Sequence, residues 1–357
     1  MNRAINFSAG PAMLPEPVLS QMQNELLDFQ GSGMSIMEVS HRGQLFGSVQ
    51  EEIERDLSSL LDLPPDYRII LMHGGAQAQF SMIPMNFCNH NNAAPAYIQT
   101  GHWGRLAVKA ARQYVNPCLI DQSGSVTMPE SGWNIPDDAS YVYMVDNETV
   151  NGIEFNHPPS VGDIPLISDM SSNFLSRPVD LTDYGMVFAC AQKNLGIAGV
   201  TVAIVSEELL AREVLPFTPP LYAYREVLAK SSTPNTPATF SWYVMGLVLK
   251  WVKAQGGLSA MNELAVERSQ LLYDFIDSSS FYHAPVEEVS RSRMNVPFLL
   301  ADEALQDAFL KQAEAVGLTH LKGHKAVGGC RASLYNSMTV PGVQSLIAFM
   351  KAFEKQA

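Results

Sequence analysis

A single lysine, Lys193, stands between two runs of strand-forming apolar residues, MVFAC (186–190) and GVTVAIV (199–205). Continuous apolar runs of this length predict strands buried on both faces of a sheet. The two glycines of the connection AQKNLGIAG predict a tight turn. A lysine at a strand end is most often a solvated surface residue. Held between buried strands, however, it loses solvent, and its neutral amine is the nucleophile that Schiff-base chemistry requires.

Three further signals follow predicted strands. The stretch GGAQAQF (74–80) is a glycine turn that opens a helix, where backbone N–H groups can cradle a phosphate, although it matches neither the P-loop nor the GxGxxG pattern. Trp103 in TGHWGRL is either a platform for a flat ring or part of the core. Asp169 in PLISDMSSN is either a buried carboxylate at a strand end or the N-cap of a following helix.

These four signals form a chemically specific set if they converge. Ligands of open α/β sheets bind outside the carboxyl ends of the strands, which is where all four are expected. A pyridoxal phosphate enzyme needs a Schiff-base lysine, an acid partner for the pyridine nitrogen and a phosphate site. Lys193, Asp169 and the glycine turn meet these needs, and we place one strand–helix–strand step between Asp169 and Lys193.

A set of basic residues remains, and its members are His41, Arg42, His324, Lys325 and Arg331. Each alone is typical of a surface. Together in an acidic chain they would form a pocket for a dianionic substrate, with Arg331 suited to bidentate carboxylate binding. His320 and His324 are four residues apart, but no third metal ligand accompanies them, so we expect no metal site.

The surrounding pattern predicts the elements that position these residues. Apolar residues recur at helical spacing from Val18, in a helix that should end near Gly31, and again from Phe46 to Leu60. From Arg68 short strands alternate with helical runs, which predicts an α/β fold with a mostly parallel sheet and helices on both faces. The rhythm changes near residue 256. We therefore expect a large domain of residues 16–255 and a smaller α+β domain of residues 256–357 with the N-terminal segment 1–15.

Composition narrows the class of protein. The 357 residues carry a formal net charge of −13, which argues against general nucleic-acid binding. The four cysteines have neither metal nor redox spacing, and the N-terminus lacks the apolar core of a signal peptide, so we expect a cytoplasmic protein with reduced thiols. The most apolar helical run, from Phe240, is interrupted by two lysines and is too short to span a bilayer, so we expect no membrane association.

Nine segments together carry a family resemblance. They are NFSAGPAMLP, MEVSHRG, HGGAQAQF, DNETVNGIEF, DMSSNFLSRPVD, AQKNLGIAGVT, NTPATFSWY, RSRMNVPF and LKGHKAVGGCRASLYN. In this order, over nearly the whole chain, they resemble the phosphoserine aminotransferases, homodimeric class V members of the fold type I pyridoxal phosphate enzymes. The resemblance implies transamination between 3-phosphohydroxypyruvate and glutamate, giving O-phosphoserine and 2-oxoglutarate in serine biosynthesis. Some members also use 4-phosphohydroxythreonine in pyridoxine biosynthesis.

The resemblance also implies a role for each site residue. Lys193 would hold pyridoxal 5'-phosphate and shuttle the substrate α-proton, Asp169 would pair with the ring nitrogen, Trp103 would stack on the ring, and Thr149 would hydrogen-bond its phenolic oxygen. Ala76, Gln77 and Gln192 would hold the phosphate, with Asn235 and Thr236 reaching across from the partner subunit. Arg331 would bind the substrate α-carboxylate. His41, Arg42, His324 and Lys325 would bind the substrate phosphate or the glutamate side chain.

Three positions depart from other members of that family. Gln77 stands where some carry arginine, Ala9 where some carry serine, and Lys325 where others carry arginine. Other functions fit less well. A desulfurase would need a cysteine in a mobile loop, a nicotinamide dehydrogenase would need GxGxxG, and a non-catalytic dimer would be expected to have lost the lysine or its acid partner.

Overall fold

The computed structural model describes residues 3–88, 93–122, 124–127 and 132–356 of the chain. Its centre is a seven-stranded sheet in the spatial order β2-β10-β9-β8-β5-β3-β4. Only β10 runs antiparallel to its neighbours. The strands are β2 Tyr67–Met72, β3 Ala96–Gln99, β4 Cys118–Asp121, β5 Val142–Val145, β8 Leu166–Asp169, β9 Met186–Cys190 and β10 Thr201–Ser206. The predicted mostly parallel α/β sheet is confirmed.

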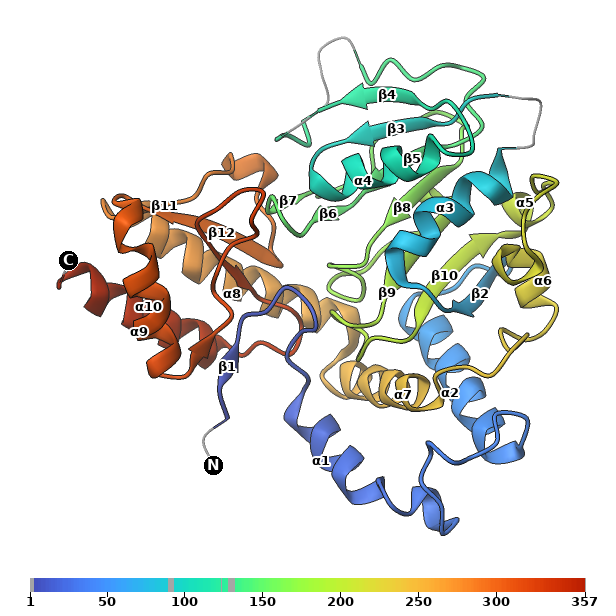
Figure 1. The fold of residues 1–357 in the computed structure, drawn as a ribbon, viewed down its shortest axis with the longest axis horizontal. Coiled ribbons are helices and arrows are strands. Elements are labelled where there is room, and N and C mark those ends of the chain that lie inside the picture. The colour runs from blue at the N-terminus through green and yellow to red at the C-terminus, as the bar shows by residue number, and fades with distance from the viewer. Residues whose placement is uncertain (1–2, 89–92, 123, 128–131, 357) are drawn as a thin grey trace.

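Helices cover both faces of this sheet because its strands are apolar on both sides (Figure 1). One face packs on α1 Glu16–Glu25, α2 Gln44–Leu60, α7 Thr239–Ala254 and the start of α8 Gly257–Ser278. The other packs on α3 Gly75–Phe87, α4 His102–Ala111, α5 Glu207–Leu210 and α6 Tyr224–Leu228. Alternate residues of one strand, such as Ile69 and Ile70 of β2, belong to the two different cores.

A third core lies beyond the large sheet. It joins the C-terminal half of α8 to a three-stranded sheet and two helices: β11 Tyr282–His283, β12 Asn295–Leu300, β14 Cys330–Ser333, α9 Gln306–Ala315 and α10 Val340–Glu354. The N-terminal strand β1 Ile5–Asn6 pairs with β13 Leu318–Thr319, and Phe7 packs in this core. The division into domains at residue 256 stays a prediction, since α8 contributes side chains to both the first and the third core.

The sequence prediction was wrong about two connections. The first helix ends at Glu25 instead of near Gly31, and a 3-10 turn, Phe29–Gly31, follows it. No α-helix joins β8 to β9 across the described residues 170–185, which form turns and one 3-10 helix, Leu181–Asp183. Side chains hold these turns in place of helical hydrogen bonds: the Ser172 hydroxyl donates to the Asn147 carbonyl at 2.7 Å, and Ser176 donates to the Asn173 carbonyl at 2.6 Å.

The register of the sheet brings four strand ends together. Met72 and Cys190 both pair with Thr201 across β10, Asp169 pairs with Phe188, and Val145 pairs with Asp169. The carboxyl ends of β2, β5, β8 and β9 therefore lie along one edge, where ligand sites of open α/β sheets form. A hairpin, β6 Asn147–Glu148 and β7 Ile153–Glu154, leaves β5 at the same edge.

Candidate active site

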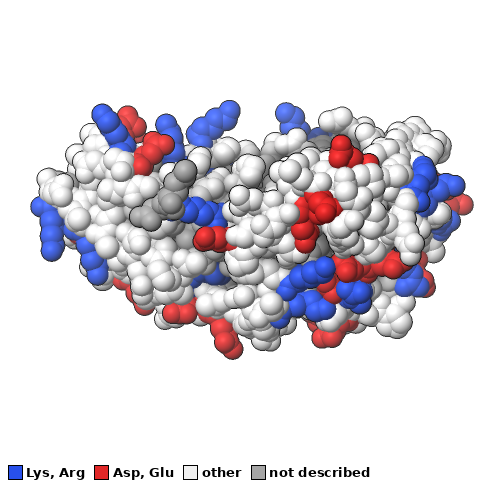
Figure 2. Space-filling view, turned by 90° about the horizontal axis from the view of Figure 1, so that it is seen from below, with Lys and Arg blue, Asp and Glu red and all other residues white. Residues whose placement is uncertain are grey.

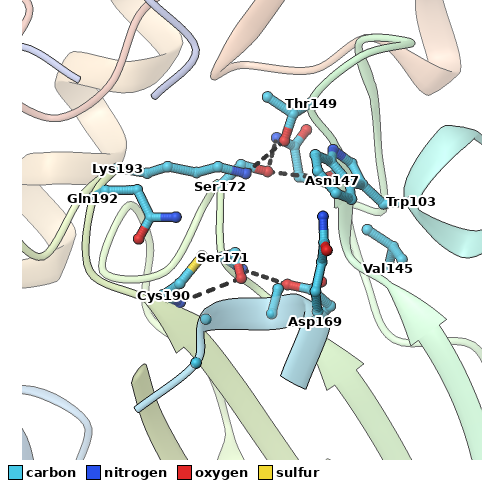
Figure 3. A pocket seen from close by; sticks show the side chains of 14 residues that line it. Trp103, Val145, Asn147, Thr149, Asp169, Ser171, Ser172, Cys190, Gln192 and Lys193 are labelled. Atoms are coloured by element: carbon cyan, nitrogen blue, oxygen red, sulfur yellow. Dashed lines mark hydrogen bonds between the residues drawn. The ribbon is translucent and has the colours of Figure 1, made fainter. Parts of the chain in front are cut away.

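A cavity of about 280 Å³ opens at this edge of the sheet (Figure 3). Its lining comes from the start of α3, the start of α4, the β6 hairpin, and the ends of β5, β8 and β9. The lining residues are Gly74, Gly75, Ala76, Gln77, Trp103, Val145, Asn147, Thr149, Asp169, Ser171, Ser172, Cys190, Gln192 and Lys193. Seven residues predicted from the sequence to bind a cofactor are among them.

Lys193 is presented by the turn between β9 and β10, as predicted. Its Nζ donates a hydrogen bond to the Thr149 hydroxyl at 2.8 Å and lies 5.8 Å from the centre of the Trp103 ring. Figure 3 shows the side chain extended across the cavity toward Thr149. A primary amine therefore stands inside a partly enclosed site, where a carbonyl compound could reach it.

Asp169 ends β8 and faces the same cavity. Only 4% of the residue is exposed, and its Oδ1 accepts a hydrogen bond from the Ser171 backbone N–H at 2.8 Å. Burial raises the pKa of the carboxyl, while the charge of Lys193 opposes that shift. The alternative role, as a helix N-cap, is wrong because no helix follows. A cationic ring nitrogen beside this carboxylate would offset the cost of its burial.

The start of α3 forms another wall. Gly74 and Gly75 have φ of 95° and 65°, a conformation that favours glycine, and a Cβ on Gly74 would lie 2.5 Å from the Ala78 Cβ. Within the described part of the chain, no side chain accepts a hydrogen bond from the N–H groups of this first turn. These donors and the helix dipole suit an anion such as a phosphate. Ala76, Gln77 and Gln192 border the same space.

Trp103 lies in the first turn of α4, and Figure 3 shows it across the cavity from Lys193 and Gln192. Its indole Nε1 is buried and has no partner among the described residues. A flat aromatic face, an amine, a buried carboxylate and an open helix start thus surround one cavity. This arrangement fits a planar ring that carries a phosphate, a basic ring nitrogen and a carbonyl group.

Part of the predicted basic set lies beside the cavity. The Arg331 Nη1 donates to the Thr149 carbonyl at 3.2 Å, and its buried Nε has no partner in the described structure. The His324 ring lies 4.9 Å from the ring of His102, at the start of α4. Burial, Arg331 and Lys325 lower the pKa of His324. Lys325 itself is exposed.

Seven predicted site residues are absent from the lining of the cavity: the three basic residues just described and four that lie elsewhere in the chain. His41 is half-buried and Arg42 is exposed in the turns before α2, while Asn235 and Thr236 are exposed in the segment before α7. Within one chain, these residues do not complete the site. Asn235 and Thr236 were expected to act in a partner's site, which is consistent with their exposure.

Sequence reasoning missed several residues of the lining. Asn147, Ser171 and Ser172 are buried polar residues, and Asn147 Nδ2 donates to the Ser172 hydroxyl at 2.7 Å and to Asn295 Oδ1 at 2.8 Å. Their signal was their position, because each lies shortly after the end of a strand, β5 or β8. Among the described residues, no group of three or more His, Cys, Asp or Glu could hold a metal ion. Nor does that part of the chain contain a helix long and apolar enough to span a bilayer.

Comparison with protein families gives one full-length match. The model of the family described as aminotransferase class-V matches residues 4–346. A phosphoserine aminotransferase of Coxiella burnetii is 50% identical over 361 residues, covering 100% of this chain and 99% of the relative. A phosphoserine aminotransferase of Nitrosomonas europaea is 48% identical over 366 residues, covering 99% of both.

Solved structures give the same relationship. The phosphoserine aminotransferase of Bacillus circulans subsp. alkalophilus has a TM-score of 0.95 at 42% identity and covers 99% of both chains. The structure described as a PLP-bound phosphoserine aminotransferase from Trichomonas vaginalis has a TM-score of 0.92 at 39% identity, covering 98% of this chain and 100% of that one.

Proposed function

Because the chain belongs to the class-V aminotransferase family, we propose that it transfers an amino group between O-phospho-L-serine and 2-oxoglutarate, reversibly, with pyridoxal 5'-phosphate as cofactor. The family resemblance and the fold type I architecture expected from the sequence are confirmed by the full-length matches. The observation that carries the proposal is the placement of Lys193 and Asp169 around one cavity whose wall is an open helix start.

The residues of the cavity fit this cofactor. The cofactor, when bound, supplies a carbonyl group that accepts the amino group and a conjugated ring that stabilises negative charge at the substrate Cα. Lys193 would hold it through Nζ, Trp103 would cover one face of the ring, and the first turn of α3 with Gln192 would hold the phosphate. Thr149, which accepts from Nζ of Lys193, would also reach the phenolic oxygen.

The chain's own groups would then manage protons. Nζ of Lys193 would take the proton from the substrate Cα and, in the reverse direction, return it to that carbon. Asp169 would keep a proton on the ring nitrogen, since its buried carboxylate is stabilised by an adjacent positive charge. The partly enclosed cavity would limit the access of water to both groups.

Substrate recognition would depend on the basic residues. Arg331 would hold the α-carboxylate, with the Thr149 carbonyl fixing one nitrogen of its guanidinium. His324 and Lys325 would bind the substrate phosphate or the distal carboxylate of glutamate. His41 and Arg42, which lie outside the cavity of their own chain, would join them in an assembled dimer.

We propose a homodimer in which Asn235 and Thr236 complete the partner's phosphate site. Both are exposed, and the segment after α1 exposes large apolar side chains, with Leu27 85% and Met37 55% exposed. Figure 2 looks onto the face that carries α1, where wide uncharged areas separate the charged side chains. Exposed apolar side chains such as Leu27 and Met37, where they lie together, often mark interfaces between proteins. A cytoplasmic location and use of 4-phosphohydroxythreonine stay predictions.

A half-reaction tests the proposed function. Phosphoserine added to the cofactor-loaded protein should convert the visible absorbance of the bound cofactor to that of its amino form, and an equal amount of alanine should not. In Lys193→Ala, turnover should be lost while circular dichroism in the far ultraviolet stays native. A wild-type rate in Lys193→Ala would refute the role of the lysine. A visible band that does not change when phosphoserine is added would refute the assignment of phosphoserine as the substrate.

A further inference from the structure

The start of α4, which carries Trp103, has no capping residue of its own. The N-cap position is Gly101, which has no side chain. The N–H groups of His102, Trp103 and Gly104 precede the first intrahelical hydrogen bond, from Arg105 N to Gly101 O at 3.2 Å. These are the donors that a helix leaves without an intrahelical partner.

All three donors are satisfied by two side chains from the β6 hairpin. The His102 N–H donates to Asn151 Oδ1 at 2.9 Å, the Trp103 N–H to Glu148 Oε2 at 2.8 Å, and the Gly104 N–H to Glu148 Oε1 at 2.7 Å. We call Glu148 and Asn151 the α4 clamp. The carboxylate of Glu148 is fully buried, and it lies where the helix dipole favours negative charge.

Two glycines make room for the clamp. A Cβ on Gly101 would lie 2.6 Å from Asn151 Oδ1 and 2.7 Å from Glu148 Cδ. Because φ of Gly101 is −162°, which any residue adopts, the reason for glycine here is the close approach of the clamp. A Cβ on Gly104 would lie 3.4 Å from Glu148 Oε1. Both glycines of TGHWG thus border the clamp.

The hairpin that supplies the clamp packs against β12 and contacts Lys193 and Arg331. A Cβ on Gly152 would lie 2.3 Å from Cδ of Pro297 in β12, so the turn lies directly against that strand. Thr149, between the two clamp residues, accepts from Lys193 Nζ through its hydroxyl and from Arg331 through its carbonyl. One turn therefore contacts the helix start behind Trp103, the lysine and the arginine.

We propose that Glu148 and Asn151 are positioning residues that set the height and tilt of the Trp103 ring over the cavity by holding the first turn of α4. The proposal rests on the proposed function only for the statement that a cofactor ring lies against Trp103. The capping of α4 by a residue 44 positions later in the chain stands without it.

Hydrogen–deuterium exchange of the peptide spanning residues 101–106 tests the clamp in cofactor-free protein. Glu148→Gln keeps the size of the side chain but turns an NH2 group toward one of the two N–H donors. We expect exchange of this peptide to become about tenfold faster, because two hydrogen bonds to a charged group are lost or weakened. Glu263→Gln, at an exposed position of α8, is the matched control and should exchange like the wild type.

Gly101→Ala tests the same contact from the helix side, since its methyl group would displace Asn151 and Glu148 without requiring a new backbone conformation. In cofactor-loaded protein, both variants should weaken the circular dichroism of the cofactor's visible band, which reports how the ring is held. Wild-type exchange in both variants would overturn the clamp. Faster exchange with an unchanged visible signal would overturn the positioning of the ring. Neither reading depends on whether phosphoserine is the substrate.

Discussion

Two helices begin at the same cavity, but in the part of the chain that the structure describes, side chains of the protein accept hydrogen bonds from the free N–H groups of only one of them. α3 and α4 both have a glycine N-cap and no acidic residue in the first turn. The first turn of α3 borders the cavity with no side chain as cap within the described residues, whereas all three free N–H groups of α4 are held by Glu148 and Asn151. One start is left for a ligand, and the other is closed by the protein.

The site is therefore divided between a helix start that binds a ligand and a helix start that supports a side chain. An open helix start attracts an anion, so α3 can hold a phosphate only if no carboxylate of the chain reaches it first. α4 has the task of presenting a side chain, and the buried carboxyl group of Glu148 fixes it. Burial disfavours the charged form and raises the pKa of Glu148 to about 7. Two short hydrogen bonds from backbone N–H groups partly oppose this shift.

Placing a negative charge at the open start of α3 should weaken cofactor binding strongly. Gln77→Glu keeps the shape of the side chain and adds a negative charge in the first turn of α3. Two like charges about 4 Å apart repel each other by about 1 kcal/mol in water and about 4 kcal/mol near a protein surface. An intermediate repulsion of about 3 kcal/mol should lower the affinity for pyridoxal phosphate about 100-fold. Titration of the visible absorbance measures it.

Pyridoxal without phosphate is the matched ligand for this experiment, and its affinity should change by much less. The cofactor-free variant should be slightly more stable than the wild type, because a glutamate in a first turn favours the helix by about 0.5 kcal/mol. Equal losses for both ligands would place the phosphate elsewhere than at α3.

Part of this site could be predicted from the sequence alone. Lys193 and Asp169 were predictable because each polar residue directly follows an apolar strand, and the parallel sheet brings such positions to one edge. The glycine turn before α3 was recognisable for the same reason. By local sequence, however, α3 and α4 have equivalent starts, and only the tertiary structure places Glu148 at one of them.

The prediction of a helix in the connection from β8 to β9 was wrong for a related reason. One helix was expected between Asp169 and Lys193, but Ser172 and Asn173 instead use their side chains on the β6 hairpin and its neighbours. Asn173 Nδ2, for example, donates to Glu154 at 3.0 Å. Such competition between side chains and helical hydrogen bonds is decided by long-range partners that local sequence patterns do not identify.

A smaller effect should appear as a pH dependence of stability at the closed start. The pKa of Glu148 is about 7 in the folded protein against an ordinary 4.5, through burial and the charge of Asp169, with Arg105 and the two backbone N–H groups opposing. The folded protein therefore binds the proton of the Glu148 carboxyl more tightly than the unfolded chain does. The stability that this contributes is complete below pH 4.5 and is lost as pH rises through 7.

Glu148→Gln cannot titrate, so its free energy of unfolding relative to the wild type should rise by about 2 kcal/mol from pH 5 to pH 8. Urea unfolding of cofactor-free protein at one fixed concentration measures this difference. Glu263→Gln is the matched control for replacing a carboxylate by an amide at an exposed position. A constant difference between Glu148→Gln and the wild type would mean that the Glu148 carboxyl does not change its protonation in this range.

The smallest effect comes from opening the closed start, which should make α4 resemble α3. Glu148→Ala leaves the Trp103 and Gly104 N–H groups without their acceptors beside a space the size of a carboxylate. Formate should enter that space and, at several times its dissociation constant, restore about 1 kcal/mol. The unfolding midpoint of cofactor-free Glu148→Ala should then rise by about 2 °C in formate relative to chloride at equal ionic strength.

Glu148→Gln fills the space with an amide and should show no such rise, nor should the wild type. If formate and chloride gave Glu148→Ala the same midpoint, the two helix starts would differ in more than the side chain that fills one of them.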